Sequence, residues 1–198
     1  MKSKLSYIAM AVALAFVASS ARAGDITGKI TAKGARNAAN AVVYIDKIPG
    51  KVFPPPKKHA LMDQKNMTFV PHVLPILVGT TVDFLNSDDV MHNVFTPDKC
   101  AGKFNLGSWP KGQKKSYTFK KPCAAVILCN VHPEMEAYIV AVETPYFAVT
   151  AKDGSYTIKN VPAGKYTLKV WHEKLKGKPV QITVPAKGTV TQNFVIHR

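Results

Sequence analysis

Three side chains that bind metals follow one another at three-residue spacing, directly after an apolar run. The run, residues 124–128, has the length and composition of a buried strand. Cys129, His132 and Met135 then fall on a short loop that leaves the edge of a rigid sheet. A thiolate, an imidazole and a thioether on such a loop can close on one metal ion. This loop therefore needs a stiff β-scaffold beneath it.

The best candidate for a fourth ligand is His92. It follows the strand-like residues 81–85 and the turn-forming residues 86–89. Two imidazoles, one thiolate and one weak thioether form the trigonal-plus-axial set that suits copper and electron transfer. Zinc also accepts cysteine and histidine but rarely a thioether, so Met135 favours copper. The alternative is a core cysteine with unrelated surface histidines.

This predicted ligand set, His92, Cys129, His132 and Met135, resembles that of the cupredoxins, the type 1 blue-copper proteins, and among them the amicyanins most closely. The resemblance covers about residues 59–143, under half of the chain. Upstream of the ligand loop it rests on Asp63, Phe69, Pro71, the run VGTTV at 78–82 and the run HNV at 92–94. It implies an all-β fold with a cupredoxin-like Greek-key β-sandwich and one type 1 copper ion.

The resemblance also implies roles for single residues. Asn93 is expected to tie the His92 loop to the Cys129 loop by hydrogen bonds. The exposed edge of His132, flanked by Val131 and Pro133, is the expected electron port. The remaining histidines, His72 among them, are scattered singly, and we interpret them as structural or solvated.

Residues 1–23 have the features of a cleaved secretory signal. Lys2 and Lys4 precede an apolar stretch from about Tyr7 to Ala18, and residues 21–23 offer a small-x-small cleavage site. The stretch is shorter than the roughly 20 residues that span a bilayer, which disfavours a permanent membrane anchor. We therefore expect a periplasmic protein without a transmembrane segment after signal cleavage.

The other two cysteines suit an oxidising compartment. If Cys129 binds metal, Cys100 and Cys123 are left to form a disulfide. Cys123 and Cys129 are separated by a predicted strand of about 20 Å, which is too far for a bridge. Two buried free thiols, or a second contact to a soft metal, are the alternatives for Cys100 and Cys123.

Short segments of β-branched and aromatic residues between glycine and proline turns recur along the mature chain, a pattern typical of all-β proteins. We expect strands near residues 26–31, 41–45, 68–70, 74–78, 81–85, 93–95, 115–119, 124–129, 137–142, 155–158, 166–171, 180–184 and 190–196. Three successive prolines in residues 51–58 indicate a semi-rigid linker.

The last part of the chain resembles a different family. The runs DGSYTI at 153–158 and VPAGKYTL at 161–168 are similar to those of the transthyretin-like, carboxypeptidase regulatory-like β-sandwich. In that family a strand pair like residues 26–30 and 41–44 comes first. We therefore expect a copper domain at 59–143 inserted into a split accessory sandwich, made of the N-terminal strands and linker at 24–58 and of residues 144–198.

Charge differs between these parts. Residues 59–143 hold eight basic and eight acidic side chains, whereas residues 24–58 hold seven and two, and residues 144–198 hold nine and two. The accessory part therefore carries the whole positive excess of the mature chain. Through residues such as Lys174, Lys176 and Lys178, it is expected to steer an acidic redox partner, such as a c-type cytochrome or a periplasmic dehydrogenase.

Three functions compete. The preferred one is a carrier of single electrons that transforms no substrate and is not an enzyme. The second is a periplasmic protein that binds copper for delivery or buffering, which needs a more open site. A copper enzyme would need further histidine clusters, often His-x-His, and the sequence has none. A nucleic-acid partner is disfavoured because the chain shows no aromatic-basic recognition motif.

Overall fold

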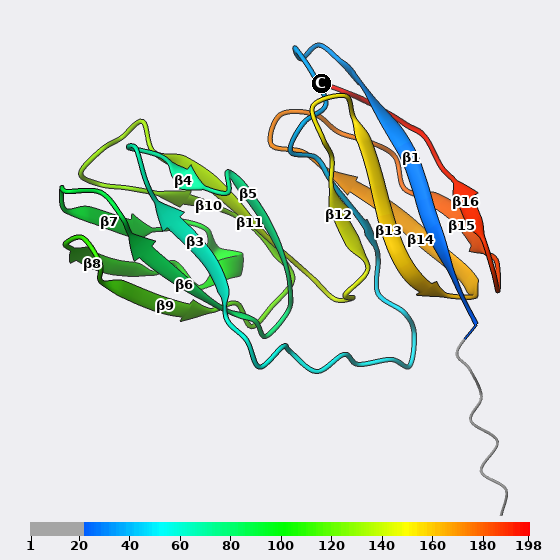
Figure 1. Ribbon diagram of the computed structural model, residues 1–198, viewed down its shortest axis with the longest axis horizontal. Helices are drawn as coiled ribbons and strands as arrows, with labels where there is room; N and C mark the ends of the chain where they lie inside the picture. The colour runs from blue at the N-terminus through cyan, green and yellow to red at the C-terminus, as the bar shows by residue number, and fades with distance from the viewer. Residues whose placement is uncertain (1–21) are drawn as a thin grey trace, which may run out of the picture.

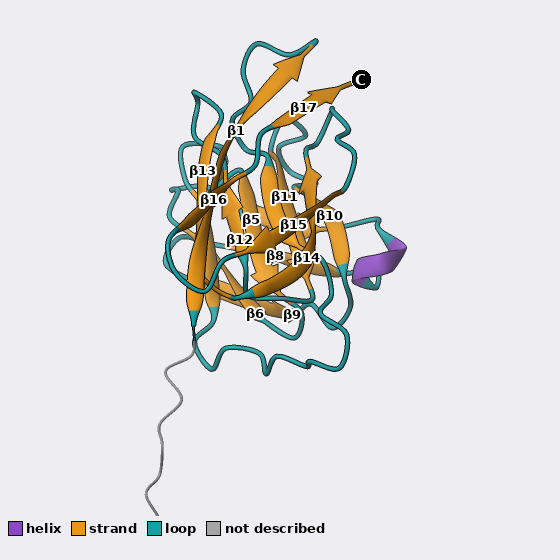
Figure 2. Ribbon diagram, turned by 90° about the vertical axis from the view of Figure 1, so that its right-hand side faces the viewer, coloured by secondary structure: helices purple, strands orange, loops and turns teal. Residues whose placement is uncertain are grey.

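The structure, a computed structural model, describes residues 22–198 as strands and connecting loops. Of the predicted signal peptide, 1–23, all but the last two residues lie outside this range. Within the described range the helical element is a single 3-10 turn, η1 (Lys99–Ala101), drawn in purple in Figure 2. No helix of this range is long and apolar enough to cross a membrane. The predicted all-β fold is confirmed.

Residues 60–142 form two sheets whose inner faces pack together, which we call the first sandwich (Figure 1). One sheet has the order β4-β3-β6-β9 and the other the order β5-β11-β10-β7-β8. The strands of the smaller sheet are β3 (Ala60–Gln64), β4 (Phe69–Val70), β6 (Thr81–Asn86) and β9 (Lys114–Thr118). Those of the larger sheet are β5 (Val73–Leu77), β7 (His92–Phe95), β8 (Asn105–Trp109), β10 (Cys123–Leu128) and β11 (Glu136–Val142).

Alternating side chains build the core of this sandwich. In β10, Cys123, Ala125 and Ile127 are buried, because successive residues of a strand point to opposite faces of its sheet. They pack with Phe84 of the opposite sheet and with Ile139 of β11 in one hydrophobic cluster. The strand that leads to Cys129 is therefore anchored in the core along its length.

Two strands of this sandwich were not predicted from the sequence. β3 has Met and Gln at its buried positions, Met62 and Gln64, and neither residue type favours strands. β8 is an edge strand with a mostly exposed pattern and a glycine at Gly107. Both form because neighbouring strands offer hydrogen bonds, which local sequence cannot reveal. Pro75 is tolerated in β5 because β5 is also an edge strand.

The N-terminal and C-terminal parts of the chain form two further sheets, the second sandwich. In the first of them β1 is central, antiparallel to β13 and parallel to both β16 and β17. The other sheet has the order β12-β2-β14-β15. The strands are β1 (Ala23–Lys33), β2 (Val42–Ile45), β12 (Phe147–Val149), β13 (Ser155–Pro162), β14 (Gly164–Trp171), β15 (Val180–Val184), β16 (Thr189–Thr191) and β17 (Phe194–His197).

The second sandwich has its own hydrophobic cluster, which includes Ile26 and Ile30 of β1, Ile45 of β2, Leu168 of β14 and Ile196 of β17. All the strands of the first sandwich lie between β2 and β12 in the sequence. The chain thus leaves the second sandwich after β2 and returns to it at β12 (Figure 1). The domain limits at 24–58, 59–143 and 144–198 stay predictions.

The predicted single strand at 190–196 is two strands. β16 and β17 pair with different parts of β1, and residues 192 and 193 separate them. The Asn193 side chain accepts a hydrogen bond from the backbone N–H of Lys29 at 2.8 Å, so it replaces a backbone partner at this break. The sequence pattern hides the break because Val190 and Phe194 are four residues apart, which fits the two-residue period of one continuous strand.

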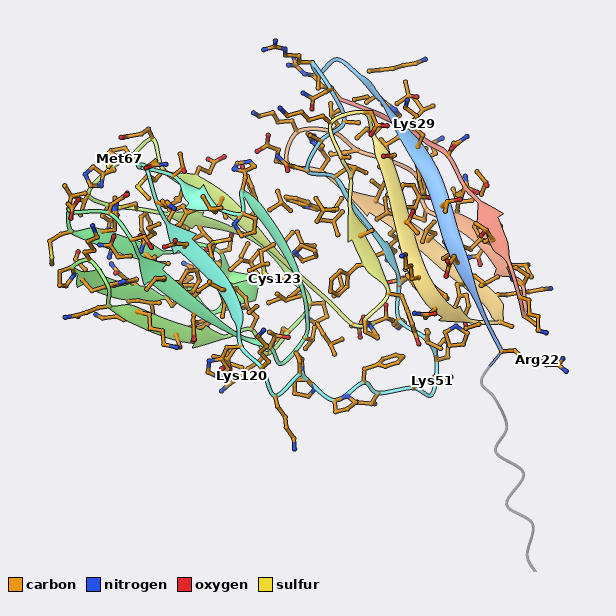
Figure 3. All side chains as sticks on the ribbon, in the orientation of Figure 1. Arg22, Lys29, Lys51, Met67, Lys120 and Cys123 are labelled. Carbon is orange, nitrogen blue, oxygen red and sulfur yellow. A yellow bond between two sulfur atoms is a disulfide. The ribbon has the colours of Figure 1, made fainter. Side chains whose placement is uncertain are left out.

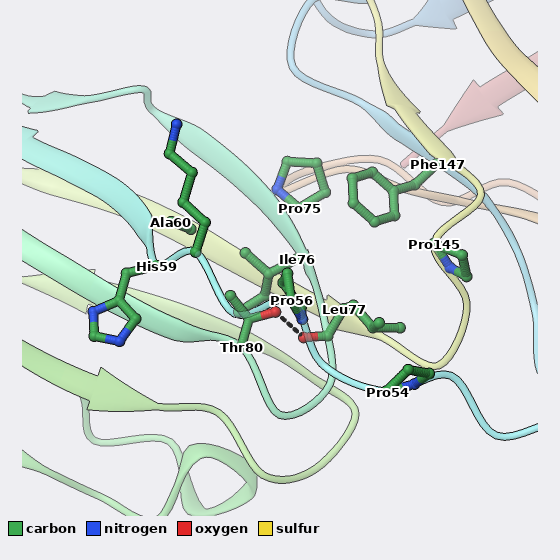
Figure 4. A pocket seen from close by; sticks show the side chains of 11 residues that line it. Pro54, Pro56, His59, Ala60, Pro75, Ile76, Leu77, Thr80, Pro145 and Phe147 are labelled. Atoms are coloured by element: carbon green, nitrogen blue, oxygen red, sulfur yellow. Dashed lines mark hydrogen bonds between the residues drawn. The ribbon is translucent and has the colours of Figure 1, made fainter.

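A smaller apolar cluster joins the two sandwiches. Val42 of the second sandwich packs with Val73, Val140 and Val142 of the first. Nearby, an open cavity of about 470 Å³ lies between β3, β5, β12 and the proline-rich connector (Figure 4). Its lining is mainly apolar and includes Pro54, Pro56, Pro75, Pro145 and Phe147. The connector thus lines a surface shared by both sandwiches.

The predicted disulfide between Cys100 and Cys123 is confirmed. It joins η1 to the first residue of β10, and Figure 3 labels Cys123 in the first sandwich. Cys129 is the free cysteine of the described chain and is buried. The bridge therefore stabilises the strand that leads to Cys129 without using that thiol.

Replacing Cys100 and Cys123 together by alanine is expected to lower the free energy of unfolding of the first sandwich. The bridge spans a sequence separation of 23, and for a loop of this size the chain-entropy model gives a contribution of about 3 kcal/mol. Denaturant unfolding of the metal-free protein measures this difference. An unchanged unfolding midpoint would contradict it.

Candidate metal centre

The predicted ligands lie on one loop and at the start of one strand, at the same end of the first sandwich. Cys129 directly follows β10, and His132 and Met135 lie on the loop between β10 and β11. His92 is the first residue of β7. β7 pairs with β10 in the antiparallel sense through Phe95 and Leu128, and this pairing sets His92 beside the loop.

Three of the four side chains converge. Nδ1 of His92 lies 3.0 Å from Nδ1 of His132, and Sγ of Cys129 lies 4.0 Å from the same His132 nitrogen. The ligand atoms of His92, Cys129 and His132 all lie within 4.8 Å of one another. His92 and Cys129 are buried, whereas His132 keeps part of its ring exposed. This grouping can hold one metal ion.

Met135 anchors the end of the ligand loop in the hydrophobic core of the first sandwich. It is 1% exposed and belongs to the same core cluster as Cys129. Its backbone N–H donates a hydrogen bond to the carbonyl oxygen of His132 at 3.0 Å, which folds the loop into a turn. The structure thus places Met135 in the core beneath the loop, and its role as the fourth ligand stays a prediction.

Asp88 orients the His92 ring through Nε2, the ring nitrogen that does not face His132. The Nε2 of His92 donates to Oδ2 of Asp88 at 2.9 Å, which leaves the Nδ1 lone pair directed toward Cys129 and His132. Burial opposes ionisation of Asp88, but hydrogen bonds from the Met67 and Asn66 backbone N–H groups and from His92 outweigh it and lower its pKa. An ionised partner of this kind fixes the tautomer and orientation of a metal-binding histidine.

Sequence reasoning assigned residue 88 only to a turn and missed this contact. The contact depends on the turn at Asn66 and Met67, which donates two backbone N–H groups to the Asp88 carboxylate from another part of the chain. A carboxylate four residues before a predicted ligand was the available signal, and it is weak because the segment is not a helix.

The variant Asp88→Ala is expected to bind copper about 10–100-fold more weakly, as is typical when the partner of a metal-binding histidine is removed. Competition with a chelator of known affinity measures the change. Asp89→Ala is the matched control, because Asp89 is exposed and bonds only to Lys111 at the surface. Equal affinities for the two variants would argue against the orienting role of Asp88.

Asn93 joins the two ligand segments, as the resemblance to the cupredoxins implied. Its backbone N–H donates to Sγ of Cys129 at 3.4 Å. Its side-chain oxygen accepts from the N–H of Asn130 at 3.3 Å, and its amide nitrogen donates to Asn105 of β8 at 2.9 Å. These contacts of Asn93 hold the start of β7 and the loop after β10 together.

Comparisons with known proteins return two kinds of similarity. The family model of the carboxypeptidase regulatory-like domain matches residues 133–197. Among solved structures, a copper-containing nitrite reductase from Thermus scotoductus SA-01 is 27% identical, with 50% of this chain and 25% of that chain covered and a TM-score of 0.42. The present chain therefore spans about a quarter of that enzyme. No curated protein matches.

Two smaller proteins are also similar. A reduced single-residue mutant of amicyanin is 25% identical, with 43% of this chain and 84% of that chain covered and a TM-score of 0.41. A purple cupredoxin from Nitrosopumilus maritimus is 24% identical, with 41% and 98% covered and a TM-score of 0.38. The structural neighbours are thus cupredoxins at low identity and partial coverage.

The family match and the strand pairing divide the chain differently. The match begins at Pro133, inside the ligand loop, whereas the C-terminal part of the accessory sandwich was predicted to begin at residue 144. Residues 136–142 form β11, which pairs with β5 and β10 of the first sandwich. The match also leaves out β1 and β2, although both pair with strands inside it.

Proposed function

We propose that this chain binds one copper ion through His92, Cys129, His132 and Met135 and passes single electrons between redox partners in the periplasm. One observation carries the proposal: a thiol and two imidazole nitrogens converge within 4.8 Å at one end of the first sandwich. Two imidazoles with one thiolate suit copper, and a buried thioether beside them favours copper over zinc.

The surrounding residues fit such an ion. Asp88 occupies Nε2 of His92, so the buried Nδ1 has a lone pair for which a metal is a suitable partner. Asn93 donates toward the sulfur and links the two loops. Copper bound here would supply a one-electron couple. The protein itself would keep the ligands in place when the copper ion gains or loses an electron. It can do so because β10, which leads to Cys129, is anchored in the core.

The exposed edge of His132 is the proposed route for electrons. Val131, beside it, is 48% exposed, and Met91, beside His92, is also 48% exposed. These two exposed apolar side chains are sequence neighbours of the two histidines, so they offer apolar surface to a partner that approaches the site. This arrangement supports an electron carrier, which binds a redox protein at this surface and converts no substrate.

The visible absorption spectrum and the redox cycle of the mature protein loaded with one equivalent of copper test this proposal. An electron carrier should show intense visible absorption, a reversible redox couple and slow copper loss to a chelator. Rapid loss to the chelator would instead support copper delivery or buffering. Absence of intense absorption would contradict the thiolate ligand and with it the proposed function.

The partner is proposed to be an acidic redox protein. Lys174, Lys176 and Lys178 are exposed on the loop between β14 and β15. Lys174 also lines a cavity of about 570 Å³ together with Glu134 and Met135 of the ligand loop. Although Glu134, Glu136 and Glu173 also line the cavity, this lysine adds a positive charge of the second sandwich beside the ligand loop. Its attraction acts within a Debye length of about 8 Å at physiological salt.

Replacing these three lysines by glutamine is expected to slow association with an acidic c-type cytochrome by on the order of ten-fold at low ionic strength. Stopped-flow kinetics at several salt concentrations measures the effect, and the copper spectrum should stay unchanged. The triple arginine variant is the control, because it keeps the charge. A rate that depends neither on salt nor on the lysines would rule out this steering.

A further inference from the structure

His72 joins the two sandwiches at the point where the ligand loop ends. Its backbone carbonyl, between β4 and β5, accepts a hydrogen bond from the N–H of Tyr138 at 2.8 Å. Its Nδ1 lies 3.1 Å from the carbonyl oxygen of Glu136, the first residue of β11. Its Nε2 lies 3.1 Å from Oε2 of Glu173, which follows β14 in the second sandwich.

The His72 ring lies between two hydrogen-bond acceptors. They are the carbonyl oxygen of Glu136 on one side and the carboxylate of Glu173 on the other. Burial opposes ionisation of Glu173, but hydrogen bonds from His72 and Lys174 outweigh it and lower its pKa. The Glu173 side chain is only 15% exposed, so solvent screens this charge-assisted contact less than an ordinary surface pair.

Glu173 is held rigidly by the second sandwich. Trp171, two residues before it, packs against Tyr138 of β11 with ring centres 5.3 Å apart. Leu175, two residues after it, is buried in the second core. Lys174 contacts the other carboxylate oxygen at 3.2 Å. The carboxylate that faces His72 therefore cannot move far without moving the second sandwich.

We propose that Glu173 is a positioning residue for the metal centre, which acts through His72 on the backbone of Glu136 and so on Met135. The inference rests on the proposed function, in which Met135 is the weak fourth ligand. Met135 directly precedes Glu136, and its N–H is bonded back to His132. Fixing Glu136 thus fixes how far the thioether can move, and the potential of such a site depends on this weak ligand.

The ligand loop is thereby tied at both ends. Asn93 holds its start, through Cys129 and Asn130, and His72 holds its end. The first tie lies wholly within the first sandwich. The second contact reaches the other sandwich. The second sandwich therefore helps to order the ligand loop, besides carrying the excess of basic side chains.

The variant Glu173→Ala tests this inference with two measurements. In the metal-free protein, amide hydrogen exchange of residues 130–136 should become on the order of ten-fold faster, as expected when a hydrogen bond to a charged group is lost. In the copper-loaded protein the reduction potential should shift. Amides in the core of the second sandwich should exchange at the wild-type rate, which separates positioning from general destabilisation.

Two further variants complete the test. Lys174→Ala removes one of the contacts that hold the Glu173 carboxylate but keeps the contact with His72, so it should change both measurements less than Glu173→Ala does. In a His72→Phe background, Glu173→Ala should have no added effect, because the coupling runs through His72. Unchanged exchange and potential in Glu173→Ala, or a full effect without His72, would overturn the proposal.

Failure of the proposed function has a different signature. The wild-type protein would then lack intense visible absorption with copper. The exchange comparison needs no metal, so it would still report whether Glu173 orders the end of the loop.

Discussion

Replacing Cys129 by serine is expected to abolish the intense visible absorption of the copper-loaded protein. In the proposed site that absorption comes from charge transfer between the thiolate and copper, and an alcohol oxygen cannot replace the sulfur in it. The hydrogen bond from the Asn93 N–H would also lose its sulfur acceptor. Absorption spectra of the two proteins at equal copper content measure the change.

Met135→Gln is the matched control. A glutamine side chain can replace a weak axial ligand, so this variant should keep copper and its colour while the reduction potential shifts. The pair of variants separates the strong ligand from the weak one. If Cys129→Ser stays intensely coloured, the thiolate assignment is wrong.

Deleting residues 24–48 is expected to unfold the second sandwich. The deletion removes β2 and nearly all of β1, the strand that pairs with β13, β16 and β17. Ile26 and Ile30 of β1 are 0% and 2% exposed. Truncation of one such side chain to alanine typically costs about 2–5 kcal/mol, whereas whole domains are stable by only about 5–15 kcal/mol.

Limited proteolysis and thermal unfolding of the deletion variant measure this loss. The part at 144–198 should be cut rapidly, and its exposed strand edges should promote aggregation. The first sandwich should keep its unfolding transition, because none of its strands is removed. A soluble 144–198 fragment that unfolds cooperatively would show that the N-terminal strands are dispensable.

The sequence predicted best what depends on neighbours in the chain. The spacing of Cys129, His132 and Met135 places them on one loop, and most strands follow from alternating apolar residues. His92 was identified from its position after a strand and a turn, and the structure sets it 3.0 Å from His132. The disulfide followed from the assignment of the third cysteine.

What the sequence could not predict depends on distant partners. Asp88 reaches His92 because a separate turn holds its carboxylate. His72, interpreted as structural or solvated, bridges two sandwiches because Glu173, a hundred residues later, lies opposite. β8 forms by pairing with β7 although its mostly exposed residues and Gly107 give little strand signal of their own. Each of these features is a tertiary contact between residues whose local patterns are ordinary.

The position of β1 also determines the order in which the chain can fold. β1 is synthesised before all other strands, yet its partners β13, β16 and β17 are among the last. The first sandwich has all its strands by residue 142, so it can fold while β1 is still unpaired. Once folded, it holds the chain between β2 and β12 compact, which lowers the entropy lost in closing so long a loop. We therefore expect the folded first sandwich to bring the two halves of the second sandwich together.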